Sequence, residues 1–342
     1  MEVLYTTLEL LVAVLCCVGN VLVIWGVKLT CSLQQPTFCF VVSLALADFL
    51  VGAVAIPMAL VLDDGLQISF DGCLFISCLV LVLTQSSVLA LLAIAVDRYL
   101  RVQIAFRYKT FATQSRTWAA VTASWVLACL IGFTPLLGWN RRDELPSANS
   151  TINCTFVTVM SMQYMVYFNF FVWILMPLLL MIILYMLVFY NIKKHLRQKE
   201  SQTFYMKEQK LAKSLALVLA LFAISWLPLH IMNCVTLFGR INEHYSWLIH
   251  TGILLSHANS AVNPIVYAFK IRKLRKAYLL IWNRVAFCRA GEISQTDLTA
   301  DAIDGSNPNS TISMDNRKIH LQGDLSINFK TVGKPPAESL PY

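Results

Sequence analysis

The stretch SHANSAVNPIVYAF occupies residues 256–269 and lies inside an apolar run that begins near Trp247. The run has the length and composition of a helix that crosses a membrane. Yet this part of it carries one histidine, two asparagines, two serines and one proline. Polar groups at membrane depth are costly, and they are retained where they bind something or join neighbouring helices. The stretch therefore predicts a membrane helix whose polar groups serve binding or helix association.

The composition of the whole chain is that of a membrane protein. Of its 342 residues, 57% are hydrophobic and only 13% are charged, whereas a typical soluble domain is about 25% charged. A helix that spans a bilayer needs roughly 20 mostly apolar residues. Seven such stretches occur, at 7–28, 38–62, 73–97, 117–139, 162–190, 211–238 and 247–269. We therefore predict an all-α membrane protein with a bundle of seven transmembrane helices.

Lysine and arginine are distributed unevenly between the predicted loops. The loops after the third and fifth helices and the segment after the seventh carry most of them, including Arg101, Arg107, Lys109, Arg116, Lys193, Lys194, Arg197, Lys207, Lys210, Lys213, Arg272, Lys273, Arg275 and Lys276. The alternate loops carry only Arg141, Arg142 and Arg240. Because basic loops stay in the cytoplasm, we expect the N-terminus outside and the C-terminus inside. The net charge of +8 is then a topology signal, and no nucleic-acid partner is expected.

The end of the chain differs in composition from the membrane domain, which we place at residues 1–289. The segment 290–342 is rich in Ser, Thr, Asp, Asn and Pro, and this predicts a disordered cytoplasmic tail. Before it, residues 270–282 space apolar side chains three to four residues apart with basic residues between them. This pattern predicts a short amphipathic eighth helix that lies on the anionic lipids of the inner leaflet.

Two covalent modifications are predicted outside the helices. Cys288 follows the amphipathic helix closely and is a candidate for palmitoylation; the alternative is an ordinary exposed cysteine. Asn149 begins an Asn-Ser-Thr sequence in an outer loop, which predicts glycosylation.

One set of polar residues lies near the middle of the predicted bundle. Asp48 is in the second helix, and Asn20, Ser87, Asn259 and Asn263 lie at a similar depth in the first, third and seventh. A lone buried carboxyl group becomes protonated or acquires a partner. Together these side chains offer oxygen ligands to a small hard cation, and the single carboxylate suits sodium. The alternative is a hydrogen-bonded network that joins the helices without an ion, and the spacing leaves both open.

A second polar set lies nearer the outer side. Trp226, His230 and Asn233 follow one stripe of the sixth helix, which Pro228 is expected to kink. The other polar groups at this depth are Glu9, Thr84, Ser256 and His257. For any one of them, hydrogen bonding between helices is the simpler explanation. The whole set favours an outer cavity for a small, neutral, flat and polar ligand.

The cytoplasmic end of the third helix carries charges that can act as a lock. In AVDRYLRV (95–102), Arg98 is placed to pair with Asp97 and, across the bundle, with Glu208 at the start of the sixth helix. Such pairs would hold the inner ends of the two helices together, and breaking them would open an inner crevice. Surface charge pairs are weak in general, so the alternative is ordinary anchoring at the membrane interface.

The motifs of these helices resemble those of rhodopsin-class G-protein-coupled receptors over about residues 8–288. The matching elements are GNVLVI, SLALADFLVG, DRY, Trp125, Pro177, SWLP and NPIVY. Amine receptors carry an Asp in the third helix where this chain has Val80, and opsins carry a Lys in the seventh where it has His257. The chain is more similar to adenosine receptors, in LTQSSVLALLAIAVDRYLRV, GFTPLLGWN, MQYMVYFNFFVWI, AKSLALVLALFAISWLPLHI and LLSHANSAVNPIVYAF.

The resemblance implies roles for individual residues. Phe156 would stack on the adenine ring, and Asn233 would form hydrogen bonds with its edge, since an amide offers both a donor and an acceptor. Ribose contacts would come from Thr84, Ser256 and His257. Further pocket residues would be Glu9, His230, Leu229, Trp226, Met165, Ile253, Val80 and Leu81. The resemblance also favours sodium at Asp48, Ser87, Asn259 and Asn263, a disulfide between Cys73 and Cys154, and an activation switch of Asp97, Arg98, Tyr99, Glu208, Tyr185 and Tyr267.

The resemblance also implies the activity and the partners. Adenosine would shift the bundle towards an active state that engages an inhibitory G protein (Gi/o) and lowers cyclic AMP, and sodium would oppose it. Receptor kinases and arrestin are expected at the tail. No pairing of nucleophile and base is apparent, so an enzyme is not expected. Coupling to Gs, another purine-like ligand, a ligand-free scaffold and a membrane transporter are the alternatives.

Departures from the common adenosine-receptor pattern point to a branch of the family. Val157 stands where many members have a Glu, Ser256 replaces the commoner Thr, and the third outer loop, FGRINEHYS, lacks a cysteine pair. These features resemble type 3 receptors, whereas His230 resembles type 1. The chain therefore resembles the inhibitory type 1/type 3 branch of the family, and within it resembles type 3 slightly more than type 1. Without the Glu, a weaker lid and faster ligand exchange are expected.

Overall fold

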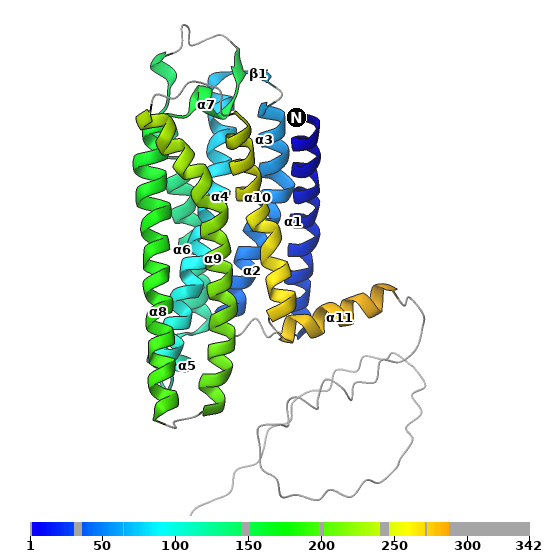
Figure 1. Ribbon diagram of the computed structural model, residues 1–342, viewed down its shortest axis with the longest axis vertical. Coiled ribbons are helices and arrows are strands. Elements are labelled where there is room, and N and C mark those ends of the chain that lie inside the picture. The colour runs from blue at the N-terminus through cyan, green and yellow to red at the C-terminus, as the bar shows by residue number, and fades with distance from the viewer. Residues whose placement is uncertain are drawn as a thin grey trace, which may run out of the picture. The chain divides into compact units, whose positions relative to one another are not determined.

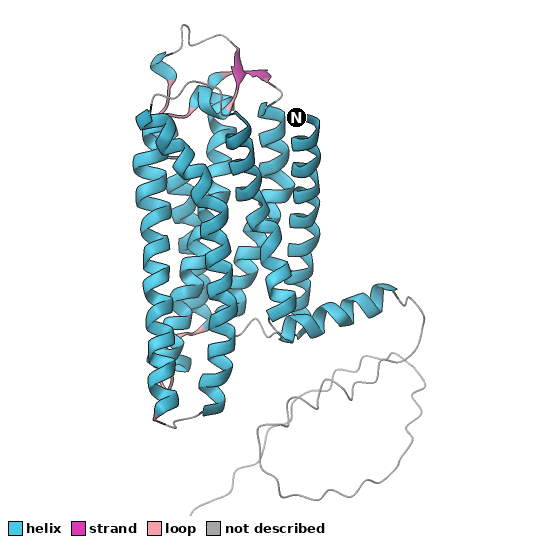
Figure 2. Cartoon of the chain, in the orientation of Figure 1, coloured by secondary structure: helices cyan, strands magenta, loops and turns pink. Residues whose placement is uncertain are grey.

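The computed structural model describes residues 2–30, 36–63, 65–144, 151–198, 202–239, 246–270 and 272–286. Within them helices predominate (Figure 2), and seven long helical segments run side by side (Figure 1). In chain order these are α1 (Glu2–Thr30), α2 (Pro36–Leu50) continued by η1 (Val51–Ala55) and α3 (Ile56–Asp63), α4 (Phe70–Gln103), α6 (Gln114–Gly132), η4 (Tyr164–Leu175) continued by α8 (Met176–Arg197), α9 (Gln202–Gly239) and α10 (Ser246–Lys270). The predictions for Asn149, Cys288 and the tail 290–342 lie outside the described residues.

The seven predicted membrane helices are all present in the bundle. By length and composition alone, five are apolar enough to cross a membrane: Val3–Leu29, Pro36–Leu62, Phe70–Gln103, Tyr164–Arg197 and Gln202–Gly239. α6 and α10 fall outside this criterion because polar residues lower their hydropathy. They are nevertheless part of the same bundle, since α6 packs on α2 and α4 while α10 packs on α1 and α9.

α4 is the central helix of the bundle. It packs against α2, α6, α8 and α9, and most of its side chains are buried. The remaining contacts run from α8 to α9, from α9 to α10, from α10 to α1 and from α1 to α2. Polar groups on α4 are therefore brought next to those of several helices that are distant in sequence.

Several helix ends differ from the prediction. The fourth helix was expected over 117–139 but ends at Gly132, so its predicted outer end was wrong. The apolar residues continue, but the chain turns through η2 (Thr134–Leu137), and Gly138 then adopts a φ of 112° that favours glycine. Pro135 lacks an N–H for a continuing helix. At the inner side, α9 begins at Gln202 rather than near 211, because its helix continues through charged residues beyond the apolar stretch.

Two segments depart from regular α-helix in a way that the hydrophobic pattern did not indicate. η1 and η4 are π-helical, and such insertions change the direction of the side chains that follow. In η1, a Cβ on Gly52 would lie 2.6 Å from the Cβ of Cys16 and 2.7 Å from the carbonyl oxygen of Ala13. Glycine therefore allows this segment to pack closely on α1, as small residues do between membrane helices.

A small β-structure lies at the same end of the bundle as the N-terminus (Figure 1). β1 (Leu66–Ile68) and β2 (Ile152–Cys154) are antiparallel, with Leu66 opposite Cys154 and Ile68 opposite Ile152. The single turn α7 (Phe156–Val159) follows β2. The sequence interpretation did not include these strands, because three-residue strands leave no periodic signal.

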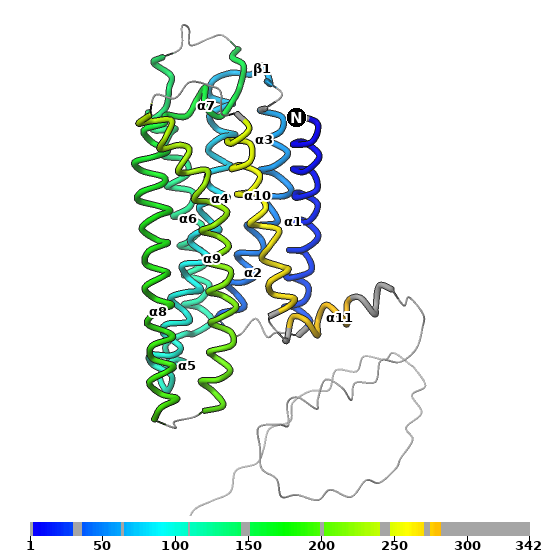
Figure 3. Tube along the Cα trace, viewed as in Figure 1, coloured from blue at the N-terminus to red at the C-terminus, as the bar shows by residue number. Residues whose placement is uncertain are grey.

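The amphipathic helix α11 (Arg272–Ala286) extends away from the bundle axis at the opposite end (Figure 3). It starts and ends slightly later than the predicted 270–282. Its buried side chains include Leu274, Ala277 and Ile281, while Arg275 and Lys276 are exposed. The apolar face packs on α1, so part of it is covered by the protein itself.

Candidate ligand and ion sites

A cavity inside the bundle joins the two polar sets that the sequence places at different depths. It is lined by Val51, Ala55, Val80, Thr84, Ser87, Trp226, Ser256, His257, Asn259 and Ser260. Its volume of about 10 Å³ is close to the space that one water molecule needs. The cavity is therefore too small for a nucleoside, and it forms a floor beneath the more outward ligand residues.

His257 at the edge of this cavity is held by a carboxylate from another helix. Its Nδ1 lies 2.8 Å from Oε2 of Glu9 on α1. Both side chains are buried, and Glu9 is only 1% exposed. A buried carboxylate is costly unless it is paired and hydrogen-bonded. The pair therefore fixes the orientation of the His257 ring and ties α1 to α10.

His230 lies deep in α9 between two aromatic rings. Its ring stacks on Phe170 at a centroid distance of 4.8 Å and on Trp226 at 5.9 Å. The side chain is 1% exposed, and within the described part of the chain neither of its ring nitrogens has a hydrogen-bond partner. The same holds for Nε1 of Trp226. Unpaired buried groups are uncommon, so these nitrogens are available to a polar ligand or to water.

The other predicted pocket residues form two groups. Phe156, Met165 and Leu81 belong to one apolar cluster around the outer end of α4. Asn233, Leu229 and Ile253 are half-buried on α9 and α10. These two helices approach closely there, since a Cβ on Gly252 would lie 3.2 Å from the Cα of Leu229.

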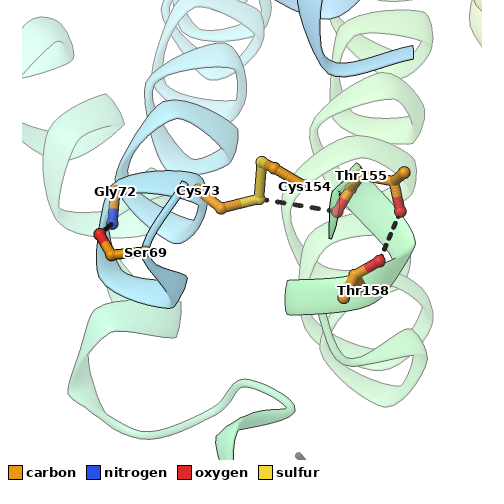
Figure 4. The surroundings of a disulfide bond; sticks show 6 residues. All are labelled: Ser69, Gly72, Cys73, Cys154, Thr155 and Thr158. Carbon is orange, nitrogen blue, oxygen red and sulfur yellow. Dashed lines mark hydrogen bonds between the residues drawn. A yellow bond between two sulfur atoms is a disulfide. The ribbon is translucent and has the colours of Figure 1, made fainter. Parts of the chain in front are cut away.

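A disulfide attaches the Phe156 turn to α4 (Figure 4). Cys73 and Cys154 are bonded with a Cα–Cα distance of 5.6 Å, which confirms the predicted bridge. Next to it, the hydroxyl oxygens of Thr155 and Thr158 are 2.6 Å apart, across the start of α7. The disulfide thereby brings the aromatic side chain of Phe156 into the outer cluster.

The carboxylate of Asp48 is fully buried and accepts three hydrogen bonds. Its donors are Oγ of Ser87 at 3.1 Å, Oγ of Ser260 at 2.9 Å and Nδ2 of Asn263 at 2.7 Å. Ser260 was missed in the sequence interpretation, although it lies three residues before Asn263 and so on the same helix face. Oδ1 of Asn259 has no partner among the described residues and belongs to the lining of the adjoining cavity.

This set of groups fits a small hard cation. A carboxylate, two hydroxyls and an unpaired amide oxygen are all oxygen ligands, which such cations prefer. Asn20 does not join them. Its amide instead donates to the carbonyl oxygens of Cys16 at 2.9 Å and Ser260 at 3.1 Å, so Asn20 links α1 to α10 beside the carboxylate.

At the inner end, the predicted lock between α4 and α9 is closed. Nη1 of Arg98 lies 3.0 Å from Oε2 of Glu208, and Nε of Arg101 lies 2.7 Å from Oε1 of the same carboxylate. Arg98 also pairs with Asp97. Arg98 is 1% exposed, so this is a buried ion-pair network rather than a surface pair.

The network has members that the sequence interpretation missed. Oγ1 of Thr37 donates to Asp97 at 2.6 Å, and the hydroxyl of Tyr108 on α5 (Tyr108–Phe111) donates to the other oxygen of Asp97. Burial and the adjacent Asp97 carboxylate raise the pKa of Tyr108. The phenol therefore stays protonated and keeps donating throughout the physiological pH range.

Among the described residues, the tyrosines of the predicted switch form no hydrogen bond with this network. Tyr185 and Tyr267 are buried in the main apolar core, and Tyr99 packs with Val102 at the inner end of α4. The hydroxyl of Tyr267 has no hydrogen-bond partner among the described residues. It can therefore gain a partner if the helices move.

Comparison with known protein sequences shows the family to which this chain belongs. The model for the 7 transmembrane receptor (rhodopsin family) matches residues 19–267. The Adenosine receptor A3 of Canis lupus familiaris is 50% identical over 299 residues, which cover 85% of this chain and 94% of that protein. The chain belongs to the adenosine receptors of the rhodopsin family. The A3 receptors of Ovis aries and Bos taurus are each 49% identical, over 84% of this chain and 92% of their own lengths.

Membership of the adenosine receptors bears out several predictions. The protein is a multi-pass receptor of the plasma membrane, and the family consists of signalling receptors rather than enzymes. The relatives carry the name of type 3 receptors, the type that Val157, Ser256 and the third outer loop favoured.

Proposed function

We propose that this receptor binds extracellular adenosine and, when occupied, activates an inhibitory G protein of the Gi/o class, which lowers cyclic AMP. The observation that best supports this proposal is the contact between Glu9 and His257, whose Oε2 and Nδ1 are 2.8 Å apart. His257 lines a cavity that Thr84, Trp226 and Ser256 also line. These groups offer donors and acceptors without a fixed cation. They suit the hydroxyls of a ribose, and half of the 299 aligned residues are identical to those of the Adenosine receptor A3 of Canis lupus familiaris.

The adenine ring would bind further outward than the ribose. Phe156, attached to α4 through the disulfide, provides an aromatic face for stacking. Asn233 lies two turns outward from Trp226 on α9 and provides a matched donor and acceptor for the edge of the base. This orientation places the N-terminus and the disulfide outside the cell, which agrees with the distribution of basic loops and with an oxidising environment.

Activation would be a shift between two arrangements of the inner end. Adenosine binds the active arrangement more tightly and so favours the separation of α9 from α4. Sodium at Asp48 favours the inactive arrangement, so the two ligands oppose each other through linkage. The opened crevice then accepts a helix from the G protein. Action of receptor kinases and arrestin on the tail stays a prediction from the sequence.

The test is a cyclic AMP assay in forskolin-treated cells that lack their own adenosine receptors. Adenosine deaminase removes ambient adenosine, and a deaminase-resistant adenosine analogue is then titrated. We expect a dose-dependent fall in cyclic AMP with the wild type. In Asn233→Ala the half-maximal concentration should rise about 100-fold, because the polar edge of the base is left unpaired.

Surface labelling of both proteins is the control for expression. A rise in cyclic AMP would support adenosine as the ligand but would identify Gs, instead of Gi/o, as the G protein that the receptor activates. No response from surface-expressed wild type, together with no binding of the labelled analogue, would refute adenosine as the ligand. An unchanged response in Asn233→Ala would refute the assigned orientation of the base.

A further inference from the structure

The outer loop before the disulfide contains two adjacent arginines with different contacts. Arg141 and Arg142 follow Asn140, which forms an antiparallel bridge with Met160 just after α7. This bridge places the arginines beside the turn that carries Phe156. Their side chains point to different partners. Within the described part of the chain, only the side chain of Arg141 contacts this turn.

Arg141 binds the backbone of α7 at two points. Its Nη1 donates to the carbonyl oxygen of Val157 at 2.8 Å, and its main-chain N–H donates to the carbonyl oxygen of Val159 at 3.1 Å. The other side of its guanidinium is held by Glu144, with Nη2 2.6 Å from Oε2. The side chain is thus fixed from both sides, by a carboxylate and by the turn.

The turn itself has little internal support. α7 is four residues long, and the backbone bonds at its ends run from the N–H of Met160 to the carbonyl oxygen of Phe156 at 3.0 Å and from the N–H of Thr158 to the carbonyl oxygen of Thr155 at 3.1 Å. A single helical turn is unstable in isolation. Its position is therefore set from outside, by the disulfide before it, by the burial of Val159 in the apolar cluster at the outer end of α4, and by Arg141, whose side chain is 41% exposed.

Val157 is the position at which many adenosine receptors carry a glutamate. Here the Val157 side chain is 52% exposed and has no polar group to close over a ligand. Its carbonyl oxygen, by contrast, is bound by a charged donor. At this position the polar contact is therefore made by the backbone, and it adjoins Phe156.

We propose that Arg141 is a positioning residue for the ligand site. It holds α7 so that the ring of Phe156 stays in place against the bound base, and it thereby prolongs ligand residence. This inference rests on the proposed adenosine function. The part of it that concerns the free receptor, the anchoring of α7, does not depend on any ligand.

Arg142 provides a matched control one residue away. Its Nη2 pairs with Asp71 at 2.8 Å and its guanidinium lies 5.3 Å from the ring centre of Phe70. Both partners belong to the first residues of α4. Arg142→Ala therefore removes the same charge from the same loop without removing a bond to α7.

The first measurement is the dissociation rate of a radiolabelled adenosine analogue from the full-length receptor in membranes. Arg141→Ala should dissociate about fivefold faster, because a charge-assisted bond that holds the site closed is lost, while association changes little. Arg142→Ala should stay within twofold of the wild type. Arg141→Lys keeps the charge but loses the fixed fork of guanidinium donors, so it should lie between them.

A second variant pair tests whether Arg141 acts through Phe156. Phe156→Leu weakens stacking by itself and should speed dissociation. If Arg141 acts through the ring, adding Arg141→Ala to Phe156→Leu produces less than half of its effect in the wild type. Independent effects would multiply, and this result would overturn the positioning role.

The third measurement needs no ligand. Hydrogen–deuterium exchange of the purified, ligand-free receptor should be faster over residues 155–160 in Arg141→Ala than in the wild type and in Arg142→Ala. Unchanged exchange would overturn the inference even if adenosine binds. Faster exchange in a receptor that binds no adenosine analogue would instead support the anchoring and refute the proposed function.

Discussion

The charged groups at the inner end of the bundle and the polar groups at the outer end differ in how many of their hydrogen bonds are made within the protein. At the inner end, Arg98 pairs with Asp97 and Glu208, and Arg101 pairs with Glu208. Thr37 donates to the Asp97 oxygen that Arg98 also contacts, and Tyr108 donates to the other one. At the outer end, several buried atoms of the described residues have no partner, among them both ring nitrogens of His230, Nε1 of Trp226 and Oε1 of Glu9.

This difference indicates that the inner network holds two helices together, whereas the outer groups are suited to binding a ligand. A closed network is stable without any ligand, and opening it has a cost that a ligand or partner must supply. Unpaired groups do the reverse, because they destabilise the free state and lose that penalty when a ligand binds. Asp48, which lies between the two ends, has both kinds of neighbour: satisfied donors and the unpaired oxygen of Asn259.

Among the variants that test this comparison, opening the lock is expected to have one of the two largest effects. Glu208→Gln keeps the shape of the side chain but removes the charge that Arg98 and Arg101 share. The closed arrangement loses these ion pairs and the open one does not, so ligand-free signalling should rise about tenfold. Nucleotide exchange on purified Gi, with deaminase present and receptor amounts matched, measures this. Unchanged exchange would mean that the network is only structural.

The next effect is expected at the outer end. Glu9→Gln replaces the charged partner of His257 by a neutral one of the same size, so a charge-assisted hydrogen bond becomes an ordinary one. Agonist affinity should fall about tenfold, as measured by equilibrium binding of a radiolabelled analogue. His257→Ala should lose affinity as well. If the two act as one unit, the double variant is no weaker than His257→Ala alone, and additive losses would contradict this.

A smaller effect is expected between the ends. Replacing a large organic cation by sodium should weaken agonist binding to the wild type about fivefold, which corresponds to sodium at about four times its dissociation constant. Asp48→Asn removes the carboxylate but retains an amide of similar shape, so its agonist affinity should be the same in both salts. A wild-type receptor that is indifferent to sodium would leave the Asp48 cluster as a hydrogen-bonded network only.

The smallest effect is expected from the outer member of the lock. Arg101 is 26% exposed, so water screens its pair with Glu208 more than that of Arg98. Arg101→Gln should therefore raise ligand-free nucleotide exchange only about twofold. An effect as large as that of Glu208→Gln would show that Arg101, rather than Arg98, carries the closed state.

The comparison also shows why some site residues could be predicted and others could not. Asp48, Arg98 and His257 are conspicuous because charge or an imidazole is rare at their depth in a membrane helix. Ser260 and Thr37 were missed because hydroxyls occur commonly in such helices and can bond to their own backbone. Arg141 was seen only as a basic loop residue, since its partners in α7 are backbone carbonyls that carry no sequence signal.

The sequence by itself determined the seven helices, because hydrocarbon requires long apolar segments whose backbone hydrogen bonds are satisfied within each segment. It also determined the depth of each polar group along its helix. Only the tertiary structure decided which groups meet: that Glu9 holds His257, that Ser260 rather than Asn20 joins Asp48, and that Arg141 holds the Phe156 turn. The physical reason is that helix rotation, π-helical insertions and the disulfide set these contacts, and each depends on neighbours that are distant in the chain.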